Sequence, residues 1–205
     1  MGEADVLVRM RDGQSRKAAT LDEYFELHGA RAWDRMQDVA RSSPDAFDDA
    51  VVDWVVEHRA ASPRSAFSVL LHLAGRDPKR AAALTARFRD LVAEHPAEAL
   101  AAAGYNLYEH GPALHGEEWV AVARAYYDAN PEGAWGIAAS AARHAPEALP
   151  PAQVDFFAER RADRPREYLE MLFGVAAYDA TQREALMARA LRDFDAFPAA
   201  AVEAA

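Results

Sequence analysis

The chain of 205 residues contains no cysteine. This absence excludes disulfide bridges, thiolate nucleophiles, zinc–thiolate sites and iron–sulfur clusters. Bases are also scarce: only Lys17 and Lys79 are lysines, and 23 lysines and arginines face 33 acids, giving a net charge of −10. Because a nucleic-acid-binding surface needs a basic stripe that displaces counterions from phosphates, we expect no nucleic-acid partner.

The sequence also lacks a long apolar run. A membrane-spanning helix needs about 18 consecutive apolar residues, and no stretch of the chain supplies them. The first ten residues are too short and too charged for a secretory signal. A hydrophobic fraction of 51% beside 27% charged residues nevertheless excludes a disordered chain. We therefore expect a folded cytoplasmic protein without a membrane partner.

What the chain does have is an internal repeat, carried by its prolines. Eight of the 11 prolines form two interleaved series, with spacings of 34, 34 and 34 residues in one and 33, 35 and 34 in the other. Proline is tolerated near the start of a helix, where its missing N–H costs nothing. The spacing therefore predicts units with two helices each. The series are Pro44, Pro78, Pro112 and Pro146, and Pro63, Pro96, Pro131 and Pro165.

Apolar residues follow the same period. Within a unit they recur every three or four residues, the pattern of an amphipathic helix. Two positions illustrate the alignment: Trp54, Phe88, Val122 and Phe156 in the first helix, and Phe67, Ala101, Trp135 and Leu169 in the second. We predict helix–turn–helix repeats at 44–77, 78–111, 112–145 and 146–179.

The two ends of the chain resemble degenerate copies of the repeat. Residues 20–42 resemble a further helix pair, and residues 181–197 a capping helix. Thr20 with Glu23 and Thr181 with Glu184 have the spacing of a capping box. We predict one helical repeat domain over 20–197, a short β-hairpin or irregular arm at 1–19 and a frayed tail at 198–205.

This pattern resembles the α-helical repeat class of tetratricopeptide and HEAT-like arrays. The 34-residue period fits tetratricopeptides, but the first-helix position of Trp54 and Phe88 holds a small residue in that consensus. The resemblance therefore stays at the level of class. It implies an all-α, right-handed α-solenoid of about four repeats between degenerate helical caps.

Four acids share one face of the helix predicted after Pro44. Asp45, Asp49, Asp53 and Glu57 follow one another at four-residue intervals. The 34-residue period places Lys79 opposite Asp45 and Arg87 opposite Asp53, which predicts ion pairs between neighbouring helices. The alternative is that Asp49 and Asp53 contact a basic partner.

A polar or small position interrupts the apolar second helices. It is occupied by His72, Asn106, Ser140 and Gly174. Such a line of residues forms a binding groove in many repeat proteins, and the alternative is that it marks the solvent edge of each helix. Tyr127 falls in a position of mixed polarity, so we expect it at the surface as a further binding residue.

No stretch of the sequence has the spacing of a known metal site. The residues that come nearest are His110, His115 and Glu118, around the predicted turn between the second and third repeats. We predict no metal and no cofactor.

The sequence offers no nucleophile–base pair and no phosphate-cradling glycine loop. We therefore favour a non-enzymatic binding module that presents its repeat surface to a protein or peptide, as an adaptor, inhibitor or immunity-type protein does. The excess of acid favours a basic partner. Two alternatives stay open: a small-molecule-binding or catalytic helical cup lined by His72, Asn106 and tyrosines, and a homo-oligomeric structural protein. The chain is expected to be a monomer or a homodimer.

Overall fold

The computed structural model describes residues 20–110 and 116–199, with the helical backbone alone for 105–110 and 116. Over these ranges the chain forms eleven α-helices, four short 3-10 helices and no strand, which confirms the all-α class. The predicted arm at 1–19 and most of the predicted tail lie outside the described residues. Among the described helices, none has the length and apolarity to span a membrane.

The chain divides into two compact units, and the boundary lies between Ala93 and Glu94. This boundary falls within the predicted repeat 78–111, between its two helices. We call the part up to Ala93 the first unit and the part from Glu94 the second unit. The single repeat domain over 20–197 remains a prediction.

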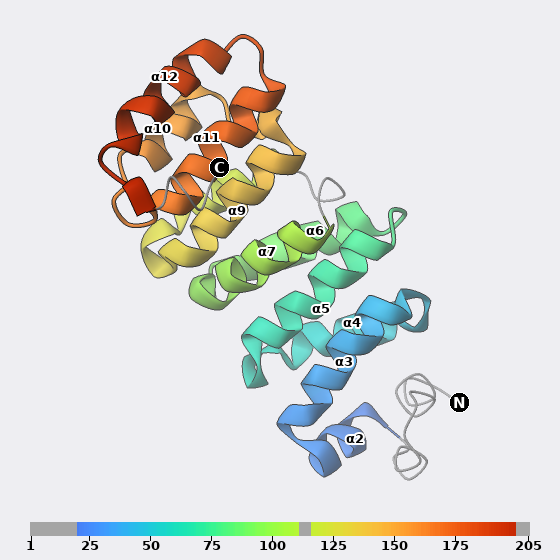
Figure 1. The fold of residues 1–205 in the computed structure, drawn as a ribbon. Coiled ribbons are helices and arrows are strands. Elements are labelled where there is room, and N and C mark those ends of the chain that lie inside the picture. The colour runs from blue at the N-terminus through green and yellow to red at the C-terminus, as the bar shows by residue number, and fades with distance from the viewer. Residues whose placement is uncertain (1–19, 111–115, 200–205) are drawn as a thin grey trace. The chain divides into compact units, whose positions relative to one another are not determined.

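The first unit is built around α5, which packs against α3 and α6 (Figure 1). Its core consists of apolar side chains that the helices turn inward, among them Met36, Phe67, Leu71 and Phe88. The elements are α2 (Leu21–His28), α3 (Ala30–Ser42), η2 (Pro44–Ala46), α4 (Asp49–Glu57), η3 (Arg59–Ala61), α5 (Pro63–Arg76) and α6 (Ala81–Val92).

The second unit is built around α9, which lies between α7 and α11, while α12 covers α11 (Figure 1). Its core is rich in large rings, among them Trp119, Trp135, Phe157 and Tyr168. The elements are α7 (Pro96–His110), α8 (Gly116–Ala125), η5 (Tyr127–Ala129), α9 (Pro131–His144), η6 (Pro146–Ala148), α10 (Pro151–Ala158), α11 (Pro165–Tyr178) and α12 (Arg183–Phe194).

The two proline series have different structural roles. The helices α5, α7, α9 and α11 begin at the four prolines of the second series, as the spacing predicts. In the first series, Pro44 and Pro146 begin 3-10 helices that precede α4 and α10, and Pro78 lies in a turn before α6. A fixed φ and a missing N–H suit all these places. Pro112 lies outside the described residues.

Side-chain caps hold several helix starts. The Thr20 hydroxyl accepts the N–H of Glu23, and Asn130 accepts the N–H of Gly133 at 2.9 Å. The predicted box at Thr181 is wrong, because α12 begins at Arg183 without a side-chain cap, and the Thr181 hydroxyl donates to Asp179 at the end of α11. Hydrogen bonds from Thr181 and Gln182 lower the pKa of the Asp179 carboxyl to about 2.

Glycines allow two helix pairs of the second unit to approach closely. A Cβ atom on Gly133 of α9 would lie 2.6 Å from the backbone carbonyl of Leu100 on α7. A Cβ atom on Gly174 of α11 would lie 2.9 Å from the Cβ of Ala142 on α9. Small residues at these positions therefore set the distance between the helices. The position of Gly174 belongs to a helix–helix contact and not to the solvent edge.

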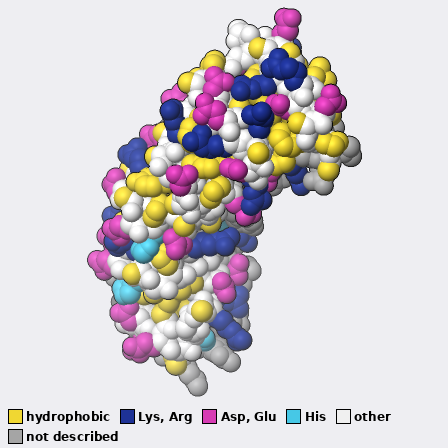
Figure 2. Space-filling model, turned by 90° about the vertical axis from the view of Figure 1, so that its left-hand side faces the viewer, with side chains coloured by type: hydrophobic (Ala, Val, Ile, Leu, Met, Phe, Trp, Pro, Cys, Tyr) yellow, Lys and Arg dark blue, Asp and Glu magenta, His cyan; other side chains and the backbone are white. Residues whose placement is uncertain are grey.

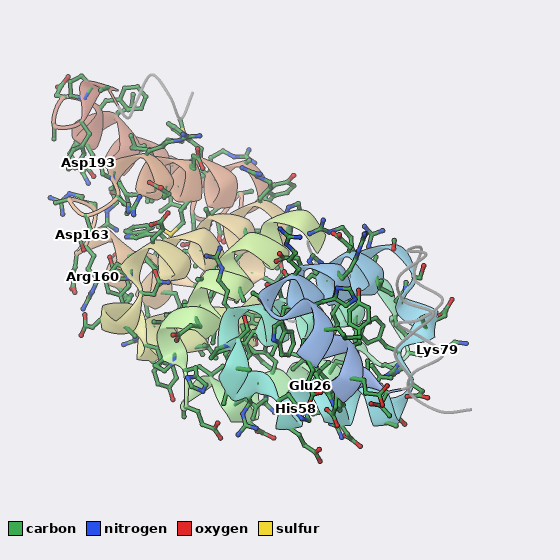
Figure 3. The ribbon with its side chains drawn as sticks, turned by 90° about the horizontal axis from the view of Figure 1, so that it is seen from below. Glu26, His58, Lys79, Arg160, Asp163 and Asp193 are labelled. Carbon is green, nitrogen blue, oxygen red and sulfur yellow. The ribbon has the colours of Figure 1, made fainter. Side chains whose placement is uncertain are left out.

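Hydrogen-bonded tyrosines join the helices of the second unit. Tyr127 accepts the indole N–H of Trp135 at 2.8 Å and donates its hydroxyl to Asp163 at 2.9 Å. Tyr168 donates to Asp193 at 2.6 Å. Asp163 and Asp193 lie along one flank of this unit (Figure 3). The expectation of a surface Tyr127 is wrong, since its side chain is only 5% exposed and joins the buried Trp135 to the exposed Asp163.

These tyrosines predict a loss of stability at alkaline pH. Burial and the bond to Asp163 raise the pKa of Tyr127 to about 12, and burial with the bond to Asp193 raises the pKa of Tyr168 as well. An unfolded tyrosine ionises near pH 10, so this contribution is complete below about pH 10 and is lost as the pH rises towards 12. Urea unfolding across this range should show the fall, and Tyr127→Phe should make it shallower. A constant free energy of unfolding would contradict the prediction.

Arginines and carboxylates alternate on the surface of the second unit (Figure 2). Arg164 pairs with Glu132 at 2.9 Å, and Arg166 pairs with Glu170 at the same distance. The guanidinium of Arg160 lies over the Phe156 ring, 3.8 Å from its centroid. These three arginines are thus matched by acids and a ring of the same unit.

Candidate functional site

An open cavity of about 610 Å³ lies in the first unit. The helices α2 and α3 form one side of it, and the end of α4 with the following turn forms the other. Aromatic and acidic side chains dominate its wall. The cavity is lined by Asp22, Phe25, Glu26, Gly29, Ala30, Trp33, Trp54, His58, Ala61 and Ser62, and we call it the aromatic pocket.

Gly29 shapes the pocket by reversing the chain between α2 and α3. Its φ of 54° and ψ of −133° lie in a region that side chains with a Cβ rarely adopt. The Gly29 N–H donates to the Phe25 carbonyl at 2.8 Å, which closes α2. Because the reversal takes a single residue, side chains from the last turns of α2 and the first turns of α3 face the same space.

Three aromatic rings form the base of the pocket. The Phe25 centroid lies 4.6 Å from that of Trp54 and 5.1 Å from that of Trp33, and the two tryptophans are 6.1 Å apart. His58 stacks on Trp54 at 4.0 Å with an angle of 14° between the planes. Trp33 and Trp54 are buried and Phe25 is half-buried, so the rings both support the unit and line the cavity.

Two carboxylates of α2 stand beside these rings. Asp22 accepts the indole N–H of Trp54 at 2.8 Å through Oδ1, and the same oxygen lies 3.5 Å from Nε2 of His58. Glu26 follows four residues later, on the same face of the helix, and lines the cavity together with His58; both are labelled in Figure 3. Within the part of the chain that the structure describes, no hydrogen bond or ion pair engages the Glu26 carboxylate or Oδ2 of Asp22.

The charge of the pocket is one-sided. Asp22 and Glu26 both line it, and no lysine or arginine is among the described residues of the lining. Apolar rings next to carboxylates suit a ligand with an apolar stem and a positive end, because the stem gains from burial and the charge from the acids.

The pocket is less suited to hydrolytic chemistry, although Asp22, His58 and Ser62 line it together. His58 Nδ1 lies 2.9 Å from the Trp54 carbonyl and Nε2 faces Asp22, so both ring nitrogens are engaged. Ser62 donates its hydroxyl to Ser65 at 2.9 Å. A general base needs a nitrogen directed at the nucleophile, and this arrangement provides none.

Replacing Gly29 by alanine should weaken the pocket. A Cβ atom at this position meets no neighbour within 4 Å, so the cost arises from the backbone conformation alone. We expect a loss of about 1–2 kcal/mol in the free energy of unfolding. Urea denaturation followed by tryptophan fluorescence measures it. A Gly29→Ala variant as stable as the wild type would show that the chain can reverse here without a positive φ.

Two residues of the predicted polar line on the second helices are buried. His72 of α5 and Ser140 of α9 are buried, and His72 Nε2 lies 3.4 Å from a guanidinium nitrogen of Arg41 on α3. The expectation of a surface line is wrong at both positions, because consecutive second helices pack against each other there. The side chain of Asn106 lies outside the described residues.

The predicted ion pairs between α4 and α6 are confirmed in part. Arg87 pairs with Asp53, as the 34-residue period indicates. Near the start of α4, the basic residue that pairs with an acid is Arg80 and not the predicted Lys79. The Arg80 guanidinium lies 3.3 Å from the Asp49 carboxylate and donates to the Phe47 carbonyl at 2.6 Å. Asp49 and Asp53 therefore have partners within the chain, and their contact with a basic partner remains a prediction.

The nearest candidates for a metal site are not assembled by the described residues. His115 and the side chain of His110 lie outside them, and Glu118 is exposed in the first turn of α8. Elsewhere in the described ranges, no three histidines or acids gather in a way that could hold a metal ion.

Sequence reasoning missed every residue of the aromatic pocket as a site. Trp33 and Trp54 fall in apolar repeat positions, which predict core residues, and both are indeed buried. The signal that could have pointed to the site is the pair Asp22 and Glu26 around Phe25 in the degenerate first helix. This pattern covers only five residues, and it indicates a site only when α3 and α4 are known to pack beside this helix.

A second cavity, of about 420 Å³, lies in the second unit between α10 and α12. Arg189 lines it and is paired with Asp155, 2.7 Å away, across its wall. Arg192 is the other charged residue of its described lining, which contains no aromatic ring, so the aromatic pocket is the stronger candidate.

In comparisons with known proteins, no protein-family model, curated protein or solved structure matches this chain.

Proposed function

We propose that this chain is a non-enzymatic binding module that holds a protein or peptide partner, as an adaptor, inhibitor or immunity-type protein does. The single observation that carries the proposal is the aromatic pocket, an open cavity whose two carboxylates face no lysine or arginine in the described lining. Pockets that combine an apolar wall with a few polar groups are the usual sites of recognition. The acidic wall favours a basic partner.

The proposal includes the finer architecture, a right-handed α-solenoid of about four 34-residue repeats. The starts of α5, α7, α9 and α11 at 63, 96, 131 and 165 support it. So does the side-by-side packing of α3 with α5 in the first unit, and of α7, α9 and α11 in the second. In such an array each repeat contacts its neighbours, and the surface so formed is extended enough for a peptide.

Selection from a random peptide display library on the immobilised full-length chain tests the proposal. We expect a family of related basic peptides whose binding weakens as salt is raised, because exposed charges are screened. Binding should also weaken when Asp22 and Glu26 are changed together to asparagine and glutamine. Failure to enrich any peptide over the bare matrix would overturn the proposal.

A small-molecule ligand is the second candidate, since the cavity volume lies in the range of small-molecule sites, about 300–1,000 Å³. Thermal-shift screening of cationic and neutral metabolites distinguishes a small-molecule ligand from a peptide partner. A stabilising small molecule together with a failed peptide selection would favour this function.

Self-association is the third candidate. Met187 and Leu191 lie four residues apart on α12 and are exposed, which gives this helix an apolar face. Light scattering over a range of concentrations tests it, and a constant monomer mass would exclude it.

A further inference from the structure

We infer that the aromatic pocket binds the guanidinium group of an arginine in a peptide. This inference rests on the proposed function and names the group that the partner presents. It follows from the charge of the pocket, the shape of its aromatic base and its size.

The charge requires a cation. Oδ1 of Asp22 is occupied by the indole N–H of Trp54, which fixes the carboxylate in place, and Oδ2 has no partner in the described chain. Glu26 lies on the same face of α2 and is likewise unengaged there. Two acceptors about one helical turn apart match a planar group with several N–H donors, and charge-assisted bonds of this kind are the stronger ones.

The shape favours a flat cation over a round one. The centroids of Phe25, Trp33 and Trp54 lie 4.6–6.1 Å from one another, so the rings touch and leave no box between them for a trimethylammonium group. A ligand must instead lie along the outer surface of the cluster. Guanidinium stacks on aromatic rings in this way, whereas the compact, strongly hydrated ammonium of lysine does not.

The size indicates a peptide and not a free cation. A cavity of about 610 Å³ exceeds what one guanidinium group fills. The apolar stem of arginine can cover the half-buried Phe25 ring, and a neighbouring residue of the peptide can occupy the space beside Ala30 and Ala61.

Nuclear magnetic resonance on the full chain tests the inference. The indole N–H of Trp54 is the reporter, because it is bonded to Asp22 inside the pocket. N-acetyl-arginine amide is titrated, with the citrulline and lysine analogues as matched ligands. We expect a saturable shift of the Trp54 signal with arginine, a weaker response with lysine and none with citrulline, which has the same shape without the charge.

The variant Glu26→Gln provides the matched test on the protein. Its side chain is exposed and unengaged within the described chain, so folding should be unaffected. We expect arginine to bind about two- to fivefold more weakly, the range for one exposed charge pair. The control Glu147→Gln removes an exposed acid from the second unit and should leave binding unchanged.

The outcomes separate this inference from the proposed function. Equal shifts with citrulline and arginine, or unaltered binding by Glu26→Gln, would overturn the arginine site. If the peptides selected by display still bound, the proposed function would stand without it. A Trp54 signal that depends on protein concentration alone would assign the pocket to a second copy of the chain and also overturn the inference.

Discussion

Replacing Trp135 by alanine is expected to lower the free energy of unfolding by about 3–5 kcal/mol, a large part of the stability of an ordinary domain. Trp135 is fully buried at the centre of the second unit. Its ring lies 4.9 Å from the Phe157 ring and 6.4 Å from the Tyr168 ring. The truncation therefore removes a large apolar surface and leaves a cavity between rigid neighbours that cannot collapse into it.

The hydrogen bond of Trp135 adds a second part to this prediction. Changing Tyr127 to phenylalanine leaves the Trp135 indole N–H without its acceptor and Asp163 without the tyrosine donor, so we expect a loss of about 1–3 kcal/mol. The double variant Trp135→Phe with Tyr127→Phe should cost less than the sum of the single variants, since the two groups interact. Urea denaturation followed by circular dichroism measures all three. If the loss in the double variant equalled the sum of the losses in the two single variants, the two side chains would not be coupled.

Replacing Gly133 by alanine is expected to cost about 2–3 kcal/mol. In an open helix this change is stabilising by about 0.5–1 kcal/mol, because alanine is the better helix former. Here the added Cβ would lie 2.6 Å from the backbone of Leu100, and backbone atoms cannot move aside as a side-chain end can. The helices α7 and α9 must then separate, which loosens the packing along their length.

The same change at Gly136 serves as the matched control on the same helix. Its Cβ would lie 3.2 Å from the Cα of Gly104, so a smaller displacement relieves the contact. We expect Gly136→Ala to be clearly less destabilising than Gly133→Ala in thermal and urea unfolding. A Gly133→Ala variant more stable than the wild type would show that α7 and α9 do not approach each other as closely as this structure has them.

The local features of the fold were predictable because neighbours in the chain determine them. Proline's fixed φ places the starts of α5, α7, α9 and α11, and the capping side chains of Thr20 and Asn130 act over three residues. The periodic apolar residues identify the faces that become buried. These are short-range effects, and the sequence alone carries them.

The predictions of exposure that were wrong concern residues whose surroundings depend on which helices become neighbours. His72, Ser140 and Tyr127 are polar, and polarity by itself predicts exposure. The structure buries His72 and Ser140 where second helices pack against each other, and it buries Tyr127 of η5 where this side chain bonds Trp135 and Asp163. No local pattern distinguishes a polar residue in such a contact from one at the solvent edge.

The sequence by itself therefore determined the helical class, the places where many helices begin and the ion pair of Asp53 with Arg87, since each follows from local chemistry or from the 34-residue period. Only the tertiary structure decided where an accessible site lies. The aromatic pocket combines side chains from α2, α3 and α4 and depends on a one-residue reversal at Gly29. Residues up to 40 positions apart meet there through packing, and neither composition nor spacing specifies that meeting.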